Sequence, residues 1–511
     1  MISMKKYNLF ILSLFLLVCT GCGNDFLTNH TTDKQQAGAP ATEGAILSNL
    51  GAAYQILLFD SYANNNYNSV PLMSDLRSDD IYKGGGDAGD QHQLYLLSQF
   101  ASTPSETLDG IWSIYYSGLA RCNNALIACD NAVDVKGNKL EQYKAEAHFL
   151  RAYYIHWLWK FWGNIPYFTK PLQPPFLARQ YSADEIYTEL MVDLDFACEA
   201  GRLEMNTTGA NTGRVNRAAA LMLKSRVILY QKDASRYGEV ASDMAEIINS
   251  GAYRLFEDFP SMWLDENEFC SESIFESNQL PEGKTWSSGW AGYGTNLPAF
   301  IAPNNLTVDA DAPDGTPKGG WGFGPVRTAA YAMYEEGDTR RAGSINTFES
   351  GTYSERFQNT GHFMAKYCAR VGYNPPPGDQ DLNYCNNVRI FRYAETLLTY
   401  AEMVVMHQQP ETGGVSAQTC LDLVRERAFG TANSIPATAE NIKMERRREF
   451  LGEGMRFWDV VRWGDTQVLN ENDGEYSSVR TWSDIRKYLP IPQGEIDKTA
   501  KTDFELVQNP Y

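Results

Sequence analysis

Apolar side chains recur at helical spacing along much of this chain, which predicts a fold built by packing helix against helix. Between residues 143 and 161 they follow at steps of three or four, so they form one stripe on a long helix. Gly163 and Pro166 then end that helix. The predicted buried stripe consists of Tyr143, Ala147, Leu150, Tyr154, Leu158 and Phe161.

Further segments carry the same periodicity in neighbouring pairs. Ser182 and Glu185 have the spacing of a capping box and predict the start of a second helix, which continues to residue 197. Helix pairs of this length, with Ala, Tyr and Leu at their contacts, resemble tetratricopeptide units, although the strict consensus of that repeat is not met. We therefore predict a mainly α fold with tetratricopeptide-like helical pairs. The other predicted helices are 216–230, 237–249, 392–406 and 417–428.

The middle of the chain has a different composition. From residue 254 to 390, Gly, Pro, Asn and Trp are crowded together, as in 284–293 and 318–325. This composition predicts long loops with small helices and few short strands, and long ordered loops in a compact protein usually carry function. The sequence thus divides into an N-terminal helical region at 41–253, a loop-rich insert at 254–390 and a C-terminal helical region at 391–511.

The charge of the chain argues against one class of partner. Its 511 residues contain 44 Lys and Arg against 63 Asp and Glu, which gives a formal net charge of −19. An acidic surface is repelled by phosphate backbones, and no block of basic residues interrupts it. We therefore expect no binding to nucleic acid.

The first residues have the pattern of an export signal. After two lysines, an apolar run from 9 to 19 is too short to span a bilayer. The sequence Cys19-Thr-Gly-Cys22 at its end resembles a bacterial lipobox. We expect residues 1–21 to be a lipoprotein signal peptide and Cys22 to be lipidated. The polar stretch 22–40 is then the tether between the membrane and the folded part.

Several long motifs occur in a fixed order from Cys22 to the C-terminus. The most specific is Glu445-Arg-Arg-Arg-Glu-Phe-Leu-Gly-Glu-Gly-Met-Arg-Phe-Trp-Asp-Val-Val-Arg-Trp-Gly464. Together the motifs resemble the SusD/RagB family of outer-membrane nutrient-binding lipoproteins of Bacteroidetes, and the resemblance extends from Cys22 to Tyr511. The accompanying motifs are Asn24–Leu27, Glu146–Tyr154, Arg392–Glu402, Tyr488–Asp497 and Gln508–Tyr511.

The resemblance implies a SusD-like fold with four tetratricopeptide-like pairs and a shallow ligand site in the irregular loops. It implies a lipid-anchored protein exposed on the cell outer membrane, where it covers a SusC-like TonB-dependent transporter. Such a protein captures glycans, and sometimes peptides, and passes them to the transporter without being an enzyme. A secreted helical glycoside hydrolase and a peptide-binding member of the same family remain the alternatives.

Aromatic side chains in Gly-rich loops are the first candidates for ligand contact. Sugar rings present apolar C–H faces that stack on Trp and Tyr, and these aromatic residues have few aliphatic neighbours in the sequence. A Trp of the core normally lies in a stretch rich in Leu, Ile and Val. The candidates in this group are Trp286, Trp290, Tyr293, Trp321 and Phe323.

The loop 69–83 is the second candidate for ligand contact. Arg77, Asp79, Asp80 and Tyr82 combine hydrogen-bond donors, acceptors and an aromatic ring within six residues. Adjacent carboxylates such as Asp79 and Asp80 diverge in most backbones, so we interpret them as acceptors for hydroxyl groups. Two acidic residues far apart in the sequence can meet in the fold as a catalytic pair, and sequence spacing alone does not decide whether they do.

The C-terminal signature itself is interpreted as structural. Glu445, Arg446, Glu449 and Glu453 are close enough on a helix to form ion pairs with one another and with neighbouring segments. Two glycines, at 452 and 454, permit a break after this helix. A short amphipathic helix through Phe457, Trp458 and Val461 then follows.

Motifs for metal or nucleotide chemistry are weak. The six histidines are scattered and form no HExxH, and the GxGxxG match at 84–89 follows no apolar strand, so we expect a flexible loop there. The acidic run 309–315 departs from the spacing of a calcium-binding loop. We expect no cofactor and no catalytic residue, with a looser calcium site as the open alternative.

Overall fold

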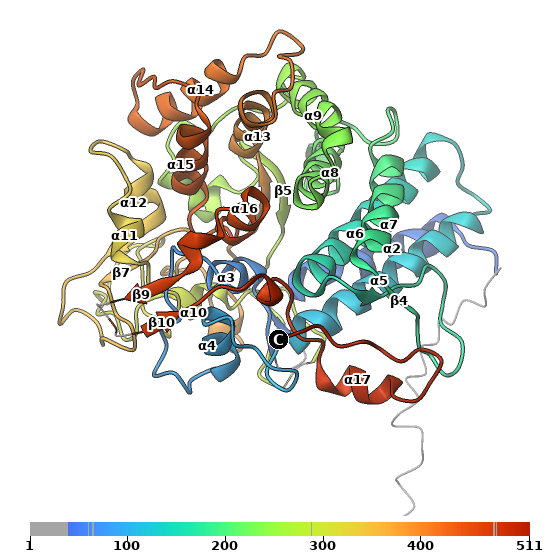
Figure 1. The fold of residues 1–511 in the computed structure, drawn as a ribbon, viewed down its shortest axis with the longest axis horizontal. Helices are drawn as coiled ribbons and strands as arrows, with labels where there is room; N and C mark the ends of the chain where they lie inside the picture. Colours follow the sequence, from blue (N-terminus) through green and yellow to red (C-terminus); the bar gives the residue numbers. More distant parts are fainter. Residues whose placement is uncertain (1–38, 60, 64–65, 288, 474–475, 477) are drawn as a thin grey trace, which may run out of the picture.

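The computed structural model describes residues 39–511 except 60, 64–65, 288, 474–475 and 477, so the predicted signal peptide and Cys22 lie outside the described residues. The described part is mainly helical (Figure 1). The longer helices are α2 (Glu43–Tyr54), α5 (Asp109–Asp130), α6 (Asn138–Trp162), α7 (Ala183–Ala197), α8 (Arg217–Gln231), α9 (Tyr237–Asn249), α13 (Tyr393–Met406), α14 (Ala417–Phe429) and α15 (Ala439–Phe450). The shorter ones are α3 (Val70–Asp75), α4 (His92–Ser98), α10 (Leu297–Ile301), α11 (Thr328–Tyr331), α12 (Arg340–Ser344), α16 (Arg456–Trp463) and α17 (Gln493–Thr499).

The long helices pack in antiparallel succession. α2 packs on α5, α6 on α7, α8 on α9, and α13 on α14, and successive pairs contact one another through α7 with α8 and α9 with α13. Figure 1 shows these pairs arranged side by side, from α2 and α5 on the right to α14 at the upper left. The predicted fold class, tetratricopeptide-like helical pairs with few short strands, is confirmed.

Local signals define the ends of these helices as predicted. In the capping box of α7, the Ser182 side chain accepts from the N–H of Glu185, whose carboxylate accepts from the Ser182 N–H. Gly163 follows α6 with a φ of 68°, in the left-handed region that glycine adopts without strain. The predicted helix 237–249 has the same bounds as α9.

The environment of α6 differs from the prediction of a single buried stripe. Every residue from Phe149 to Trp162 is buried, including Arg151, His156 and Lys160. The reason is that α2, α5, α7 and α8 all contact α6, so no face of its second half meets solvent. Periodicity identified the helix correctly but not how many neighbours it has.

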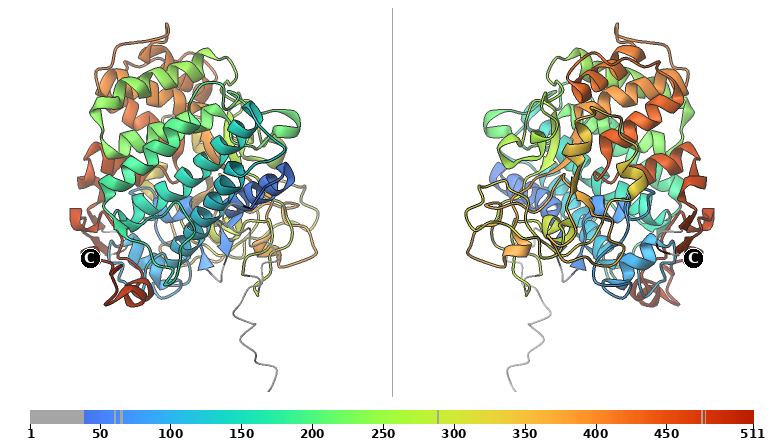
Figure 2. Two further views of the ribbon diagram at one scale, coloured as in Figure 1. Left: turned by 90° about the vertical axis from the view of Figure 1, so that its right-hand side faces the viewer. Right: turned by 90° about the vertical axis from the view of Figure 1, so that its left-hand side faces the viewer.

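The segment between α9 and α13 contains only short elements, joined by long loops. Figure 2 shows these loops, in yellow and light orange, gathered at a lower corner of the molecule beneath the helices. All strands pair antiparallel in two-stranded sheets, and β5 with β8 connects the start of this segment to its end. The pairs are β1 (Tyr62–Ala63) with β2 (Asn66–Tyr67), β3 (Ile165–Pro166) with β4 (Gln180–Tyr181), β5 (Ser273–Ser277) with β8 (Val388–Arg392), β6 (Ile345–Thr347) with β7 (His362–Met364), and β9 (Glu471–Asp473) with β10 (Ser478–Arg480).

Short 3₁₀ helices complete the described elements. Of these, η2 continues directly from α2, and η7 lies beside α10. Within residues 39–511, none of the described helices is both long and apolar enough to cross a bilayer. The 3₁₀ helices are η2 (Gln55–Phe59), η3 (Gly209–Asn211), η4 (Ala234–Arg236), η5 (Ser261–Trp263), η6 (Asp265–Asn267), η7 (Gln380–Leu382), η8 (Thr466–Leu469) and η9 (Asp484–Arg486).

Candidate functional site

The Gly-rich loop 280–293 is closed at its base by main-chain contacts. The N–H of Leu280 donates to the carbonyl of Tyr293, and the N–H of Tyr293 donates to the carbonyl of Glu282. Gly292 has a φ of 91°, and a Cβ there would lie 2.3 Å from the nitrogen of Lys284, so only glycine allows the two arms to approach this closely. The loop between the arms therefore projects its aromatic side chains from a closed base.

Two indole rings from this loop and from a distant segment lie together. Trp286 and Trp321 have ring centroids 5.9 Å apart and an interplanar angle of 27°, and we call this pair the aromatic platform. Trp286 is 42% exposed, whereas Trp321 is partly buried against Phe300 and Tyr67. Tyr62 contacts the edge of Trp286, with centroids 5.4 Å apart. The platform thus has a firm aromatic base and one open ring.

Carboxylates border the aromatic platform. The Nε1–H of Trp321 donates to Asp381 at 3.2 Å, and the backbone N–H of Trp286 donates to Asp379 at 2.8 Å. Each carboxylate keeps one oxygen that accepts no hydrogen bond from the described residues. On the other side, Arg356 donates to the carbonyl of Trp321 at 2.7 Å and remains partly exposed. The border therefore offers carboxylate acceptors beside the two indole rings and a partly exposed guanidinium group at the main chain of Trp321.

The charges of this border act on a nearby phenol. Burial raises the pKa of Tyr67, and the neighbouring Tyr62, Asp90 and Asp381 raise it further. Tyr67 therefore stays a neutral hydroxyl at physiological pH, next to anionic acceptors. This combination suits a ligand rich in hydroxyl groups better than an anionic one.

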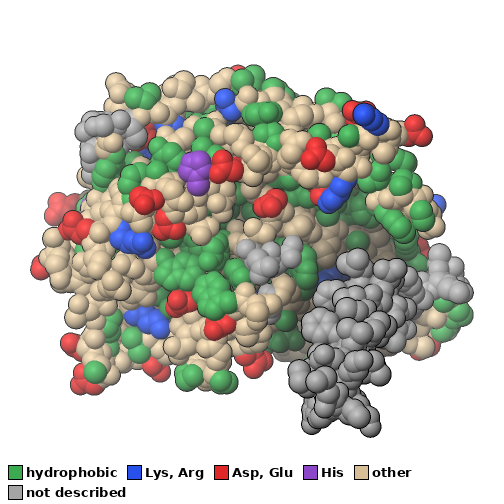
Figure 3. All heavy atoms as spheres, turned by 90° about the horizontal axis from the view of Figure 1, so that it is seen from below, with side chains coloured by type: hydrophobic (Ala, Val, Ile, Leu, Met, Phe, Trp, Pro, Cys, Tyr) green, Lys and Arg blue, Asp and Glu red, His purple; other side chains and the backbone are tan. Residues whose placement is uncertain are grey.

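Figure 3 shows the face of the molecule seen from below in Figure 1, where α4, α10 and α17 lie. A patch of hydrophobic side chains lies near its centre, with acidic and basic side chains around it. Phe300 of α10 is buried and packs against Trp321, so it supports the aromatic platform from within. An exposed hydrophobic patch bordered by polar groups often marks a binding surface.

The other aromatic candidates take different positions. Trp290 is 38% exposed and packs edge-on against Phe59, with centroids 5.5 Å apart. Tyr293 is 43% exposed and borders a separate cavity. Phe323, by contrast, is 3% exposed, because it lies between the ring of Phe300 and the ammonium group of Lys83. The prediction that the ring of Phe323 is exposed to a ligand is therefore contradicted by its burial.

Most residues of the loop 69–83 are buried. Arg77 is buried, donates to the carbonyls of Arg486 and Lys487, and lies 4.1 Å from the ring centroid of Phe457. Tyr82 is buried beneath the guanidinium group of Arg327. These contacts contradict the expectation that Arg77 faces a ligand, because distant segments cover it. Tyr82, although largely buried, borders a cavity of about 550 Å³ together with Asp79.

The two aspartates of this loop serve the same internal contact. Asp79 pairs with Arg456 at 2.8 Å and with Arg447 at 3.0 Å, and Asp80 pairs with Arg447 at 2.7 Å. Burial raises the pKa of Asp80, whereas the two arginines outweigh burial and lower the pKa of Asp79. Both carboxylates thus join the N-terminal loop to the C-terminal signature. The prediction that they are free acceptors for ligand hydroxyl groups is contradicted by these ion pairs.

The Gly-rich stretch 84–89 is also ordered by its neighbours. Gly85 donates to the carbonyl of Gly322 at 2.8 Å and accepts from the N–H of Phe357. A Cβ at Gly84 would lie 2.4 Å from the carbonyl oxygen of Gly322. The first two glycines of this stretch are therefore in close main-chain contact with the segment that carries Trp321, whereas residues 86, 87 and 89 are exposed.

The C-terminal signature forms a buried ionic network, in agreement with its interpretation as structural. Glu449 of α15 contacts Arg340 at 3.0 Å, Arg392 at 2.8 Å and Arg427 at 2.5 Å, and all four side chains are almost fully buried. These arginines come from α12, β8 and α14. One helix face thus joins three distant elements through fork-shaped hydrogen bonds.

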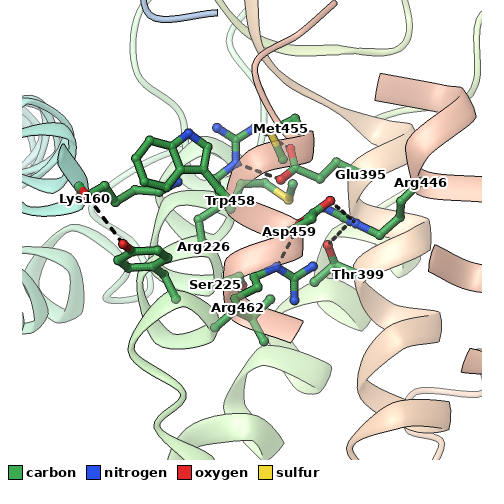
Figure 4. A pocket seen from close by; sticks show the side chains of 13 residues that line it. Lys160, Ser225, Arg226, Glu395, Thr399, Arg446, Met455, Trp458, Asp459 and Arg462 are labelled. Atoms are coloured by element: carbon green, nitrogen blue, oxygen red, sulfur yellow. Dashed lines mark hydrogen bonds and ion pairs between the residues drawn. The ribbon is translucent and has the colours of Figure 1, made fainter. Parts of the chain in front are cut away.

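The pocket beside this network is too small for a nutrient. Its volume is about 20 Å³, which is room for a single water molecule. Figure 4 shows Asp459 between Arg446 and Arg462, with Lys160 facing the ring of Trp458. At this pocket the signature therefore stabilises the fold and leaves no room for a nutrient.

Two groups of site residues were not predicted. Tyr62 and Tyr67 lie in an Asn-rich run without aliphatic neighbours, so the criterion used for the tryptophans would have identified them. Asp379, Asp381 and Arg356 carry no such signal, because only the fold brings them to the aromatic platform. In the described part of the chain, no group of His, Cys, Asp and Glu is arranged to hold a metal ion.

A helical-repeat scaffold that presents an aromatic platform on its loops defines a ligand-binding protein. The family model described as the SusD family matches residues 275–511, and the one described as "starch-binding associating with outer membrane" matches residues 39–229. The surface glycan-binding protein A from Bacteroides fluxus is 66% identical, with a TM-score of 0.89, over 92% of this chain and 100% of that one. The chain belongs to the SusD family.

Two further relatives extend this comparison. The surface glycan-binding protein A from Bacteroides thetaiotaomicron, solved in complex with laminarihexaose, is 36% identical, with a TM-score of 0.84, over 92% of this chain and 100% of that one. The SusD-like protein P25 of Formosa agariphila is 24% identical over 96% of this chain and 97% of its own length. The similarity therefore covers the whole described fold.

Proposed function

We propose that this chain is a surface lipoprotein that captures a glycan and passes it to a SusC-like TonB-dependent transporter in the outer membrane. The observation that carries the proposal is the aromatic platform, with Trp286 open and Trp321 held beneath it. The C–H face of a sugar ring packs on the open indole, and the carboxylates of Asp379 and Asp381 accept hydrogen bonds from its hydroxyl groups.

The proposed ligand is a neutral β-1,3-glucan of the laminarin type. Laminarihexaose is the ligand of a structural neighbour that is 36% identical to this chain. The border of the platform fits this class, because its carboxylates would repel an anionic polysaccharide while accepting bonds from a neutral one. The site is shallow, and two rings favour an affinity that allows release to a transporter.

We propose capture without catalysis. The carboxylates of Asp379 and Asp381 accept from a backbone N–H and an indole N–H, so in the proposed site they hold the platform in place and accept from ligand hydroxyl groups. A glycoside hydrolase and a peptide-binding protein are the competing functions, and they differ in product and in ligand.

Calorimetry with the purified chain tests the proposal. We expect laminarin to bind with a roughly micromolar to millimolar Kd and an α-glucan or a peptide mixture to bind much more weakly. A reducing-sugar assay on the same mixture should detect no product during prolonged incubation. Release of reducing ends would support a hydrolase, and preference for peptides would support the other alternative.

The proposed anchor gives a separate prediction. Cys22→Ala removes the thiol that would carry the acyl chains, and these chains supply the membrane affinity. We expect the native protein to partition into the detergent phase when expressed in a bacterial host, and the variant to stay in the aqueous phase. Cys385→Ala, a change far from the N-terminus, is the matched control. Detergent partitioning by the Cys22→Ala variant would contradict lipidation at this residue.

A further inference from the structure

A separate cavity is bordered by Tyr293, at the end of the loop that carries Trp286. It has a volume of about 340 Å³ and lies between α2, η2, the end of β5 and Tyr293. The ring of Tyr293 is 43% exposed, and Gly51 and Asn278 are exposed as well. The cavity therefore opens to solvent, and its size is at the lower end of pockets that hold small ligands. We call it the Tyr293 pocket.

The polar groups that remain available in the Tyr293 pocket are neutral. The side-chain amide of Asn278 makes no hydrogen bond with the described residues. Gln55 accepts from Arg121 at 3.0 Å through its oxygen, which leaves its NH₂ group available within the described structure. The charged group in the wall, Glu276, uses both oxygens to accept from Phe269 N–H and from Asn387.

This chemistry selects the class of ligand. One exposed phenol ring, two side-chain amides and the aliphatic carbons of Leu57 and Leu58 line the cavity. Amides donate to and accept from hydroxyl groups, and the ring covers an apolar C–H face. A charged ligand would find little free counter-charge here, because Glu276 is 1% exposed and lies 3.6 Å from Arg389. A neutral sugar residue can stack on the ring of Tyr293 and form hydrogen bonds with the amides of Gln55 and Asn278.

The pocket is connected to the aromatic platform through one loop. Three described aromatic residues between 286 and 293 meet residues 62, 59 and 58 in turn, which is the reverse of their order in the chain. Trp286 contacts Tyr62, Trp290 contacts Phe59, and Tyr293 borders the same cavity as Leu58. Exposed aromatic rings therefore follow one another from the platform to the pocket, with Trp290 between its two ends.

We propose that the Tyr293 pocket is a second subsite for the same glycan, so that a long chain occupies both the platform and the pocket. This inference depends on the proposed function and adds to it. Two linked weak contacts raise the affinity for a polymer far more than for a short oligosaccharide, because the second contact forms within the bound complex. The protein thereby selects long chains.

Calorimetry with glucans of increasing length tests this subsite. The probes are laminaritriose, laminarihexaose and laminarin, and the variants are Tyr293→Ala, Tyr293→Phe and Trp286→Ala in the full chain. We expect Tyr293→Ala to weaken laminarin binding about three- to tenfold and to leave laminaritriose binding unchanged, since one stacking contact is lost. Tyr293→Phe keeps the ring and should stay near the native affinity for every length.

The remaining variants separate failure of the subsite from failure of the proposed function. Trp286→Ala should weaken binding at every length, and Asn278→Ala, on the opposite wall of the pocket, should act like Tyr293→Ala. Native affinity of Tyr293→Ala for laminarin, or an equal loss for laminaritriose, overturns the subsite while the glycan function stands. No binding of any glucan by the native protein overturns both. Thermal unfolding of Tyr293→Ala should match the native protein, because the ring is exposed.

Discussion

The Glu449→Gln variant is expected to be strongly destabilised. The carboxylate bonds to Arg340, Arg392 and Arg427, which are all almost fully buried, and the amide of Gln removes one negative charge from this ionic network. Breaking a buried ion pair by removing one partner typically costs about 3–5 kcal/mol of the free energy of unfolding. Urea denaturation of the variant and the native protein measures this difference.

A matched control is available on the surface. Glu495 pairs with Lys498 at 2.6 Å, and the lysine side chain is largely exposed. Glu495→Gln makes the same chemical change, and we expect it to alter the free energy of unfolding by less than about 1 kcal/mol, since exposed ion pairs contribute little. Equal effects of the two variants would show that the network around Glu449 does not join the helices as described.

The acid dependence of stability provides a second measurement on the same variant. Burial opposes ionisation, but Arg427, Arg392 and Arg340 outweigh it and hold the pKa of Glu449 well below its ordinary value of 4.5. Its contribution is therefore complete above pH 4.5 and is lost as the pH falls toward the folded pKa. The difference in the free energy of unfolding between the native protein and Glu449→Gln should therefore become smaller in acid. A difference that does not change with pH would contradict the lowered pKa of Glu449.

Removal of the aromatic platform is expected to abolish most glycan binding. Trp286→Ala should weaken laminarin binding about tenfold, which is about 1.4 kcal/mol, and the double variant with Trp321→Ala about a hundredfold. The two changes should differ in stability. Trp286 is the more exposed ring, whereas Trp321 packs on Phe300 and Tyr67 and bonds to Asp381.

Calorimetry together with thermal unfolding distinguishes these effects. We expect Trp286→Ala to unfold near the native temperature and Trp321→Ala to lose about 1–3 kcal/mol of stability from its lost packing. Phe176→Ala removes an exposed ring on the loop between β3 and β4 and serves as the control, with no change in binding. Native affinity in the double variant would place the glycan site elsewhere on the protein.

The helices could be predicted because their signals are local. The ends of α7 depend on Ser182 and Glu185, which are three residues apart, and α9 begins and ends where its periodicity does. The exposure of Trp286 and Trp290 also followed from neighbours in the sequence, since Gly and Ser beside them provide no aliphatic side chains for a core. The structural role of the signature followed from its alternating charges.

The environment of the other candidates depended on segments far away in the chain. Asp79 meets Arg456 across 377 residues, and Arg77 meets Arg486 across 409, so the mixed polar loop 69–83 is an internal joint. Phe323 has the same Gly-rich neighbours as Trp321 but lies beneath Lys83. Sequence composition is the same for an exposed and a covered ring, and only packing distinguishes them.

By itself the sequence determined the helical pairs, the loop-rich middle, the family and the exposure of Trp286 and Trp290. These properties arise from contacts between residues a few positions apart, or from long motifs read in order. The tertiary structure alone decided that Trp286 lies on Trp321, that Asp379 and Asp381 border them, and that Arg77, Asp80, Tyr82 and Phe323 are buried. The physical reason is that burial and stacking are set by which distant segments pack together, and no spacing in the sequence records that choice.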